Sequence, residues 1–66
     1  MIKLSKEKFH QVIEVLTELY NDCEEEIEIY NDENEIEFVI KDSYDNIDSV
    51  SINSDSTITC NYIRPN

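Results

Sequence analysis

The spacing of apolar residues changes once along the chain, from every three or four positions to every second position. This change limits the fold to one helix followed by strands. Over residues 5–22, apolar side chains recur every three or four positions, the period of one face of a helix. Ser5 is placed to cap this helix, because its hydroxyl can accept a hydrogen bond from a free backbone N–H group. The apolar stripe consists of Phe9, Val12, Ile13, Leu16, Leu19, Tyr20 and Cys23.

Apolar and polar residues then alternate, which is the pattern of strands with one buried face. Two strands are predicted at 25–30 and 35–41, joined by a turn at 31–34. Two further strands are predicted after the polar link 42–46, with a turn at 53–56 between them. The side chains expected to face the helix are Ile27, Ile29, Ile36, Phe38, Ile40, Val50, Ile52, Ile58, Cys60 and Tyr62.

Short links between consecutive strands favour an antiparallel meander. The sequence therefore predicts an α+β fold, in which one N-terminal helix packs on a four-stranded antiparallel sheet in the order α-β-β-β-β. The helix is expected to cover one face of the sheet, while the other face meets water. The 66 residues are expected to form one small acidic domain, residues 1–66, with a small core.

The net charge of -11 excludes several classes of function. Direct binding to nucleic acid requires clustered Lys and Arg to neutralise phosphates, and the chain has only 5 such residues against 16 Asp and Glu. The same charge disfavours adhesion to an anionic membrane. No apolar stretch approaches the roughly 20 residues of a membrane span. We expect a cytoplasmic protein, located in the host cytoplasm if its gene belongs to a phage.

The acidic residues are concentrated in one region, since no basic residue lies between Lys8 and Lys41. Several of these acids oppose local stability, because the C-terminal end of a helix favours cations and like charges across a sheet repel. When many residues of one region lower local stability in the same way, here through negative charge, they indicate that function requires them. The candidate partner-binding residues are Asp22, Glu24, Glu25, Glu26, Glu28, Tyr30, Asp32, Glu33, Glu35 and Glu37.

Alternation places Glu26 and Glu28 on the water-facing side of one strand, and Glu35 and Glu37 on the same side of the next. Two rows of carboxylates would result, and spaced negative charges can meet a basic groove as a phosphate backbone does. Tyr30 shares this side and is a candidate aromatic anchor. Solubility and protection of the sheet edge are the competing explanation of the charge.

Catalytic and metal-binding patterns are not found. His10 is the single histidine, and Cys23 and Cys60 lack the paired spacing of a metal site. A calcium loop would need Gly and Glu at fixed positions, and neither is in register. The residues crowded in the candidate calcium loop are Asp42, Asp45, Asn46 and Asp48. We therefore expect a protein without catalytic residues, metal or cofactor.

The size of the chain and one acidic run resemble those of a known class of proteins. This run is E-E-E-I-E-I-Y-N-D-E-N-E-I-E at 24–37. The chain resembles the small acidic inhibitors of phages, which include anti-CRISPR proteins, anti-restriction proteins and inhibitors of uracil-DNA glycosylase, several of them DNA mimics. This resemblance implies host defence evasion, with the protein occupying a basic nucleic-acid channel and excluding its substrate. Two alternatives remain open. One is a homo-oligomeric structural or regulatory protein, such as a homodimer, and the other is an immunity protein or antitoxin for a basic nuclease.

Overall fold

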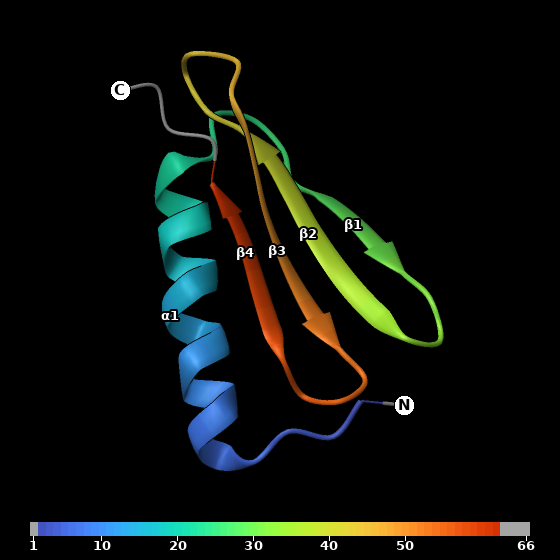
Figure 1. The fold of residues 1–66 in the computed structure, drawn as a ribbon. Coiled ribbons are helices and arrows are strands. Elements are labelled where there is room, and N and C mark those ends of the chain that lie inside the picture. Colours follow the sequence, from blue (N-terminus) through green and yellow to red (C-terminus); the bar gives the residue numbers. More distant parts are fainter. Residues whose placement is uncertain (1, 63–66) are drawn as a thin grey trace.

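The computed structural model describes residues 2–62, which form one helix packed on one four-stranded sheet (Figure 1). All neighbouring strands are antiparallel, and their order in the sheet is β1-β2-β3-β4. The predicted α+β fold and the order α-β-β-β-β are therefore confirmed. The elements are α1 (Lys6–Asp22), β1 (Glu28–Asn31), β2 (Glu35–Lys41), β3 (Ile47–Asn53) and β4 (Ile58–Tyr62).

Helix α1 begins as its sequence predicts. The Ser5 side chain accepts a hydrogen bond from the backbone N–H of Lys8, with 3.1 Å between the two atoms. The apolar stripe of α1 supplies Leu19, which is fully buried with Ile40 of β2 and Val50 of β3. The core of the protein thus lies between α1 and the two central strands.

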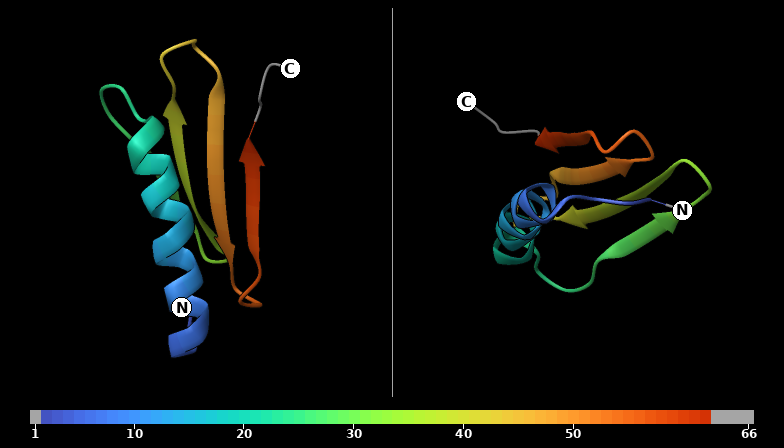
Figure 2. Two further views of the ribbon diagram at one scale, coloured as in Figure 1. Left: turned by 90° about the vertical axis from the view of Figure 1, so that its left-hand side faces the viewer. Right: turned by 90° about the horizontal axis from the view of Figure 1, so that it is seen from below.

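The register of the strands separates the two faces of the sheet. Ile29, Phe38, Val50 and Cys60 stand opposite one another across the four strands, so they share one face. Because Val50 packs against Leu19, this is the inner face, which α1 covers (Figure 2). The predicted alternation is therefore confirmed in all four strands.

Strand β1 differs from its prediction at both ends. The structure begins it at Glu28 and extends it to Asn31, so Glu25, Glu26 and Ile27 belong to the connection from α1. The alternation of side chains continues through this connection, but the chain there must travel from the end of the helix to the edge of the sheet. The alternation of apolar and polar residues indicates which face of the sheet a residue prefers. It does not indicate at which residue the pairing of β1 with β2 begins.

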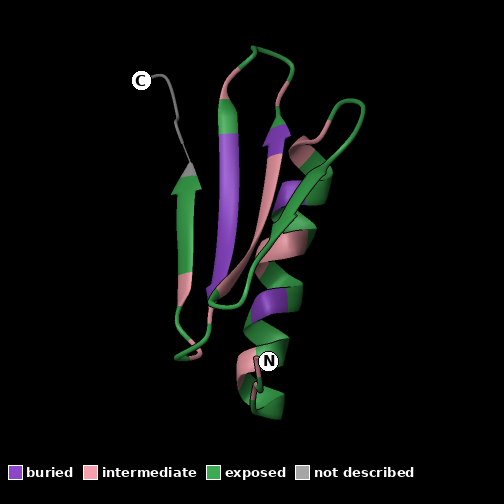
Figure 3. Cartoon of the chain, turned by 90° about the vertical axis from the view of Figure 1, so that its right-hand side faces the viewer, coloured by how far each residue is buried: buried purple, intermediate pink, exposed green. Residues whose placement is uncertain are grey.

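Burial falls from the centre of the sheet toward β1. Helix α1 packs on β3 and β2, and every residue of β1 is exposed, as the colours of Figure 3 show. Ile27 and Ile29 were expected to be inward core residues. The structure places Ile29 on the inner face, but neither residue is buried, because α1 does not extend over β1.

Candidate partner-binding surface

The outer face of the sheet brings four of the predicted residues together. Tyr30 stands opposite Glu37, and Glu28 stands opposite Val39, in the register of β1 and β2. Glu35 lies two residues from Glu37 on the same strand and therefore on the same face. We call this group the acidic face; it consists of Glu28, Tyr30, Glu35 and Glu37.

Hydrogen bonds hold two carboxylates of the acidic face in place. The Tyr30 hydroxyl donates to Oε2 of Glu28 at 2.6 Å, and the Ser51 hydroxyl donates to Oε2 of Glu37 at 3.2 Å. The hydrogen bond to the Glu28 carboxylate, followed by the charge of that carboxylate, raises the pKa of Tyr30 above its ordinary value. The Tyr30 hydroxyl therefore keeps its proton at neutral pH and can donate it in this hydrogen bond. The Glu28 carboxylate consequently has a preferred position.

Charge is distributed unevenly over the outer face. Its β1 and β2 half carries the acidic face and one cation, Lys41 at the end of β2, while its β3 and β4 half carries mostly hydroxyl and amide side chains. The residues of this uncharged half are Ile47, Ser49, Ser51, Asn53, Thr59 and Asn61. Negative charge is thus gathered on one half of a continuous surface.

The predicted rows of carboxylates are only partly present. Glu26 is not in a row with Glu28, because the structure places it in the connection before β1. Glu24, Glu25 and Glu26 instead line a hollow of about 550 Å³ at the end of the sheet. Acids from the β2–β3 loop line the same hollow. The charged residues around it are Glu24, Glu25, Glu26, Glu28, Lys41, Asp42 and Asp45.

The contribution of Asp42 and Asp45 to this acidic hollow was missed from the sequence. The two residues were considered only as ligands of a calcium loop. The predicted meander contained the necessary signal, because it places the link 42–46 at the same end of the sheet as the end of the helix.

Asp32 and Glu33 lie in the turn beside the acidic face, and Asp22 lies at the end of α1. Asp32 closes the β1–β2 turn, where its Oδ1 accepts hydrogen bonds from the backbone N–H groups of Asn34 (2.7 Å) and Glu35 (2.9 Å). Its carboxylate therefore has a structural role. Glu33 is exposed at the same turn. Asp22 is the last residue of α1, and it lines a second hollow of about 350 Å³.

The candidate calcium residues do not converge. Oδ1 of Asp42 accepts hydrogen bonds from the backbone N–H groups of Tyr44 (2.8 Å) and Asn46 (3.0 Å), so it stabilises its own loop. Asp48 is not in that loop, because it belongs to β3 and is buried on the inner face. Within residues 2–62, no group of three or more His, Cys, Asp or Glu residues is arranged to hold a metal ion.

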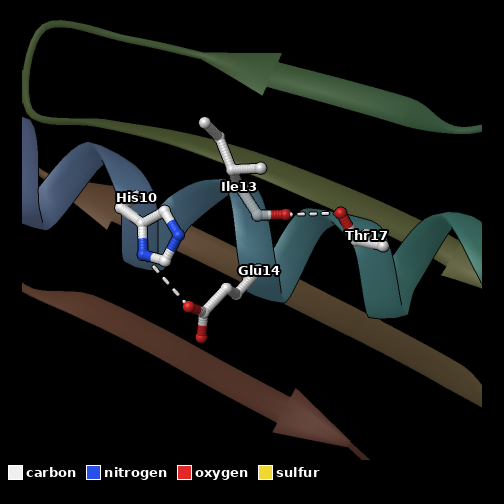
Figure 4. Close-up of polar contacts among 4 residues, drawn as sticks. All are labelled: His10, Ile13, Glu14 and Thr17. Atoms are coloured by element: carbon white, nitrogen blue, oxygen red, sulfur yellow. Dashed lines mark hydrogen bonds and ion pairs between the residues drawn. The ribbon is translucent and has the colours of Figure 1, made fainter.

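The remaining reactive side chains lie apart from the acidic face. His10 is exposed on α1, where its Nδ1 lies 3.1 Å from Oε1 of Glu14 (Figure 4). Cys23 and Cys60 are both free thiols. Cys60 was expected to face the helix, and it does lie on the inner face, but its side chain is exposed.

In the part of the chain that the structure describes, no helix is both long and apolar enough to cross a membrane. The interpretation of the acidic face depends on its own geometry and charge. Comparisons with protein-family models, with curated proteins and with solved structures found no match for the chain.

Proposed function

We propose that the protein is an inhibitor that presents its acidic face to a basic nucleic-acid-binding protein and blocks the access of that protein to DNA or RNA. The observation that carries this proposal is the uneven charge of the outer face. Solubility would be served equally by acids spread over the whole sheet. Acids gathered on neighbouring strands repel one another, which costs stability, so their position calls for a partner that compensates them.

The geometry of the acidic face suits a basic groove. Alternate residues of a strand are about 6.8 Å apart, so β2 holds Glu35 and Glu37 at a fixed spacing. Glu28 adds a third carboxylate from β1, and its hydrogen bond to Tyr30 limits its freedom before binding. Positioned charges lose less conformational entropy on binding than free ones. They also attract a basic partner over a distance and thereby accelerate association.

Tyr30 supplies an apolar contact within the charged surroundings. It is 55% exposed and lies between the carboxylates of β1 and β2. Exposed tyrosines are frequent anchors of protein interfaces, because the ring buries a large area and the hydroxyl remains hydrogen-bonded. An immunity protein or antitoxin acting on a basic nuclease would use the same surface. Self-association through this face is disfavoured, because it would bring like charges together.

The proposal is tested by affinity capture with elution by nucleic acid. The protein is immobilised and exposed to a nuclease-treated lysate of the organism that makes it, and bound proteins are eluted with a DNA or RNA oligonucleotide. We expect elution of a basic nucleic-acid-binding protein, because the oligonucleotide competes for the same groove.

Two charge-matched variants make the test specific. The Glu28→Gln, Glu35→Gln, Glu37→Gln variant should lose the captured protein. The Glu7→Gln, Glu14→Gln, Glu18→Gln variant removes the same number of charges from exposed positions of α1 and should retain it. Equal losses of the captured protein in both variants would show that only net charge matters, and would overturn the proposal. The proposal would also be overturned if high salt released a captured protein that the oligonucleotide did not elute.

A further inference from the structure

Helix α1 leaves an apolar strip uncovered on the inner face of the sheet. Ile29 of β1 is 57% exposed, although it faces the same side as the core, and Ile27 before it is 41% exposed. On the helix, Phe9 is 54% exposed and Ile13 is 47% exposed. We call these four residues the apolar strip.

The two halves of the apolar strip border the same part of the sheet. Ile13 points from α1 toward the side on which β2 and β1 lie, whereas Glu14 points toward β4 (Figure 4). Phe9 lies one turn before Ile13 and therefore on the same flank of α1. Phe38 of β2, which stands opposite Ile29, is only half-buried and packs against the core of Leu19, Ile40 and Val50. In the view from below, α1 lies against one face of the sheet, and β1 lies next to β2 at the edge of the sheet (Figure 2).

Acids border β1, the sheet half of the apolar strip, at both ends, whereas Lys6 lies one turn before Phe9 on the helix half. The connection with Glu24, Glu25 and Glu26 lies at one end of β1, and the turn with Asp32 and Glu33 lies at the other. A second copy of the chain would add another net charge of -11 to this region, so self-association through the strip is electrostatically unfavourable. A partner with basic residues beside its apolar side chains complements both the charge and the exposed surface.

We propose that the apolar strip is a docking site for a basic amphipathic helix of a partner protein. The apolar side chains of that helix would contact Phe9, Ile13 and Ile29, while its Lys or Arg residues would face the acids at the two ends of β1. A helix fits this site better than a strand does, because a strand added to the free edge of β1 would extend the sheet away from α1 and leave Phe9 and Ile13 exposed. The proposal does not depend on the proposed function, because the acidic face lies on the opposite side of the sheet.

The test uses a synthetic 14-residue amphipathic peptide of Leu and Lys as the probe. Its affinity for the full chain is measured by fluorescence anisotropy, and its position is read from the methyl NMR signals of the isoleucines. We expect the signals of Ile13, Ile27 and Ile29 to shift. A peptide with Ser in place of every Leu keeps the charge, and it should bind at least about tenfold more weakly, because apolar burial contributes strongly to affinity.

Variants separate docking on the strip from general attraction. Ile13→Gln with Ile29→Thr keeps the local helix and strand propensities and should weaken the Leu/Lys peptide at least about tenfold. Tyr44→Thr with Ile47→Thr removes exposed apolar side chains from elsewhere and should leave the affinity unchanged. Circular dichroism checks that both variants are folded.

Three kinds of result would overturn the proposal. The first is an affinity that does not depend on apolar contacts, seen either as equal binding of the Ser-containing peptide or as an undiminished affinity of the Ile13→Gln, Ile29→Thr variant. The second is a set of shifts restricted to the outer face. The third is a dimer of the protein alone in sedimentation that dissociates in this variant, because the strip would then be occupied by a second copy.

Discussion

Replacing Asp48 by valine is expected to stabilise the protein. Asp48 lies on the inner face of β3, opposite Ile40 and two residues from Val50, and only 1% of its surface is exposed. Neither of its carboxylate oxygens has a hydrogen-bond partner among the residues that the structure describes. Leaving a buried polar group unsatisfied costs about 1–3 kcal/mol. Asp48→Val removes this cost and introduces a β-branched side chain that suits a strand beside aliphatic neighbours.

The expected gain in the free energy of unfolding is therefore about 1–3 kcal/mol, the cost just given. For a domain of this size, each kcal/mol raises the thermal midpoint by about 4–8 °C. Urea and thermal unfolding followed by circular dichroism measure both quantities. Asp48→Asn should gain less, because its amide would be equally unsatisfied. Glu25→Val is the matched control, since it removes the same charge from an exposed position.

Two results would refute this reasoning about Asp48. A variant Asp48→Val that is less stable than the wild type would show that the carboxylate makes a favourable interaction. An equal gain in Glu25→Val would show that the benefit comes from relief of overall repulsion and not from the buried site.

Three other predictions concern charge, hydrogen bonding and the core. The thermal midpoint should rise with added NaCl, because screening over about 8 Å at physiological ionic strength relieves the repulsion of a net charge of -11; a falling midpoint would contradict this. Glu28→Gln should lower the pKa of Tyr30 in a spectroscopic phenol titration, because it removes the charged acceptor that raises it; an unchanged pKa would show that the hydrogen bond is not formed. Leu19→Ala should cost about 2–5 kcal/mol in urea unfolding, as is typical of a fully buried leucine, whereas Glu35→Gln should be neutral or stabilising; similar effects of the two would mean that the core has been misplaced.

The fold could be predicted largely from its two hydrophobic periods. The helical period gave the stripe that buries Leu19, and the alternation placed Phe38 and Val50 on the inner face. The start of β1 could not be predicted, because alternation continues through residues that pair with nothing. The burial of Asp48 was passed over because its acidic character assigned it to a loop, although alternation with Val50 placed it on the inner face.

The candidate surface was predictable only within the strands. Alternation correctly placed Glu28, Glu35 and Glu37 on one face, since this depends only on strand periodicity. The hollow that joins Glu26 to Asp45 depends on how the α1–β1 connection and the β2–β3 loop approach each other in space. The exposure of Ile29 depends on the width of the sheet that α1 covers, and no local pattern encodes that width.

Competition with nucleic acid for the captured partner tests the proposed function most directly. A labelled oligonucleotide is bound to that partner, and its release is followed by fluorescence anisotropy as this protein is added. The wild type and the Glu7→Gln, Glu14→Gln, Glu18→Gln variant should both displace the oligonucleotide, whereas the Glu28→Gln, Glu35→Gln, Glu37→Gln variant should not. Simultaneous binding of the oligonucleotide and this protein, without mutual weakening, would contradict a role of the acidic face in blocking access to nucleic acid.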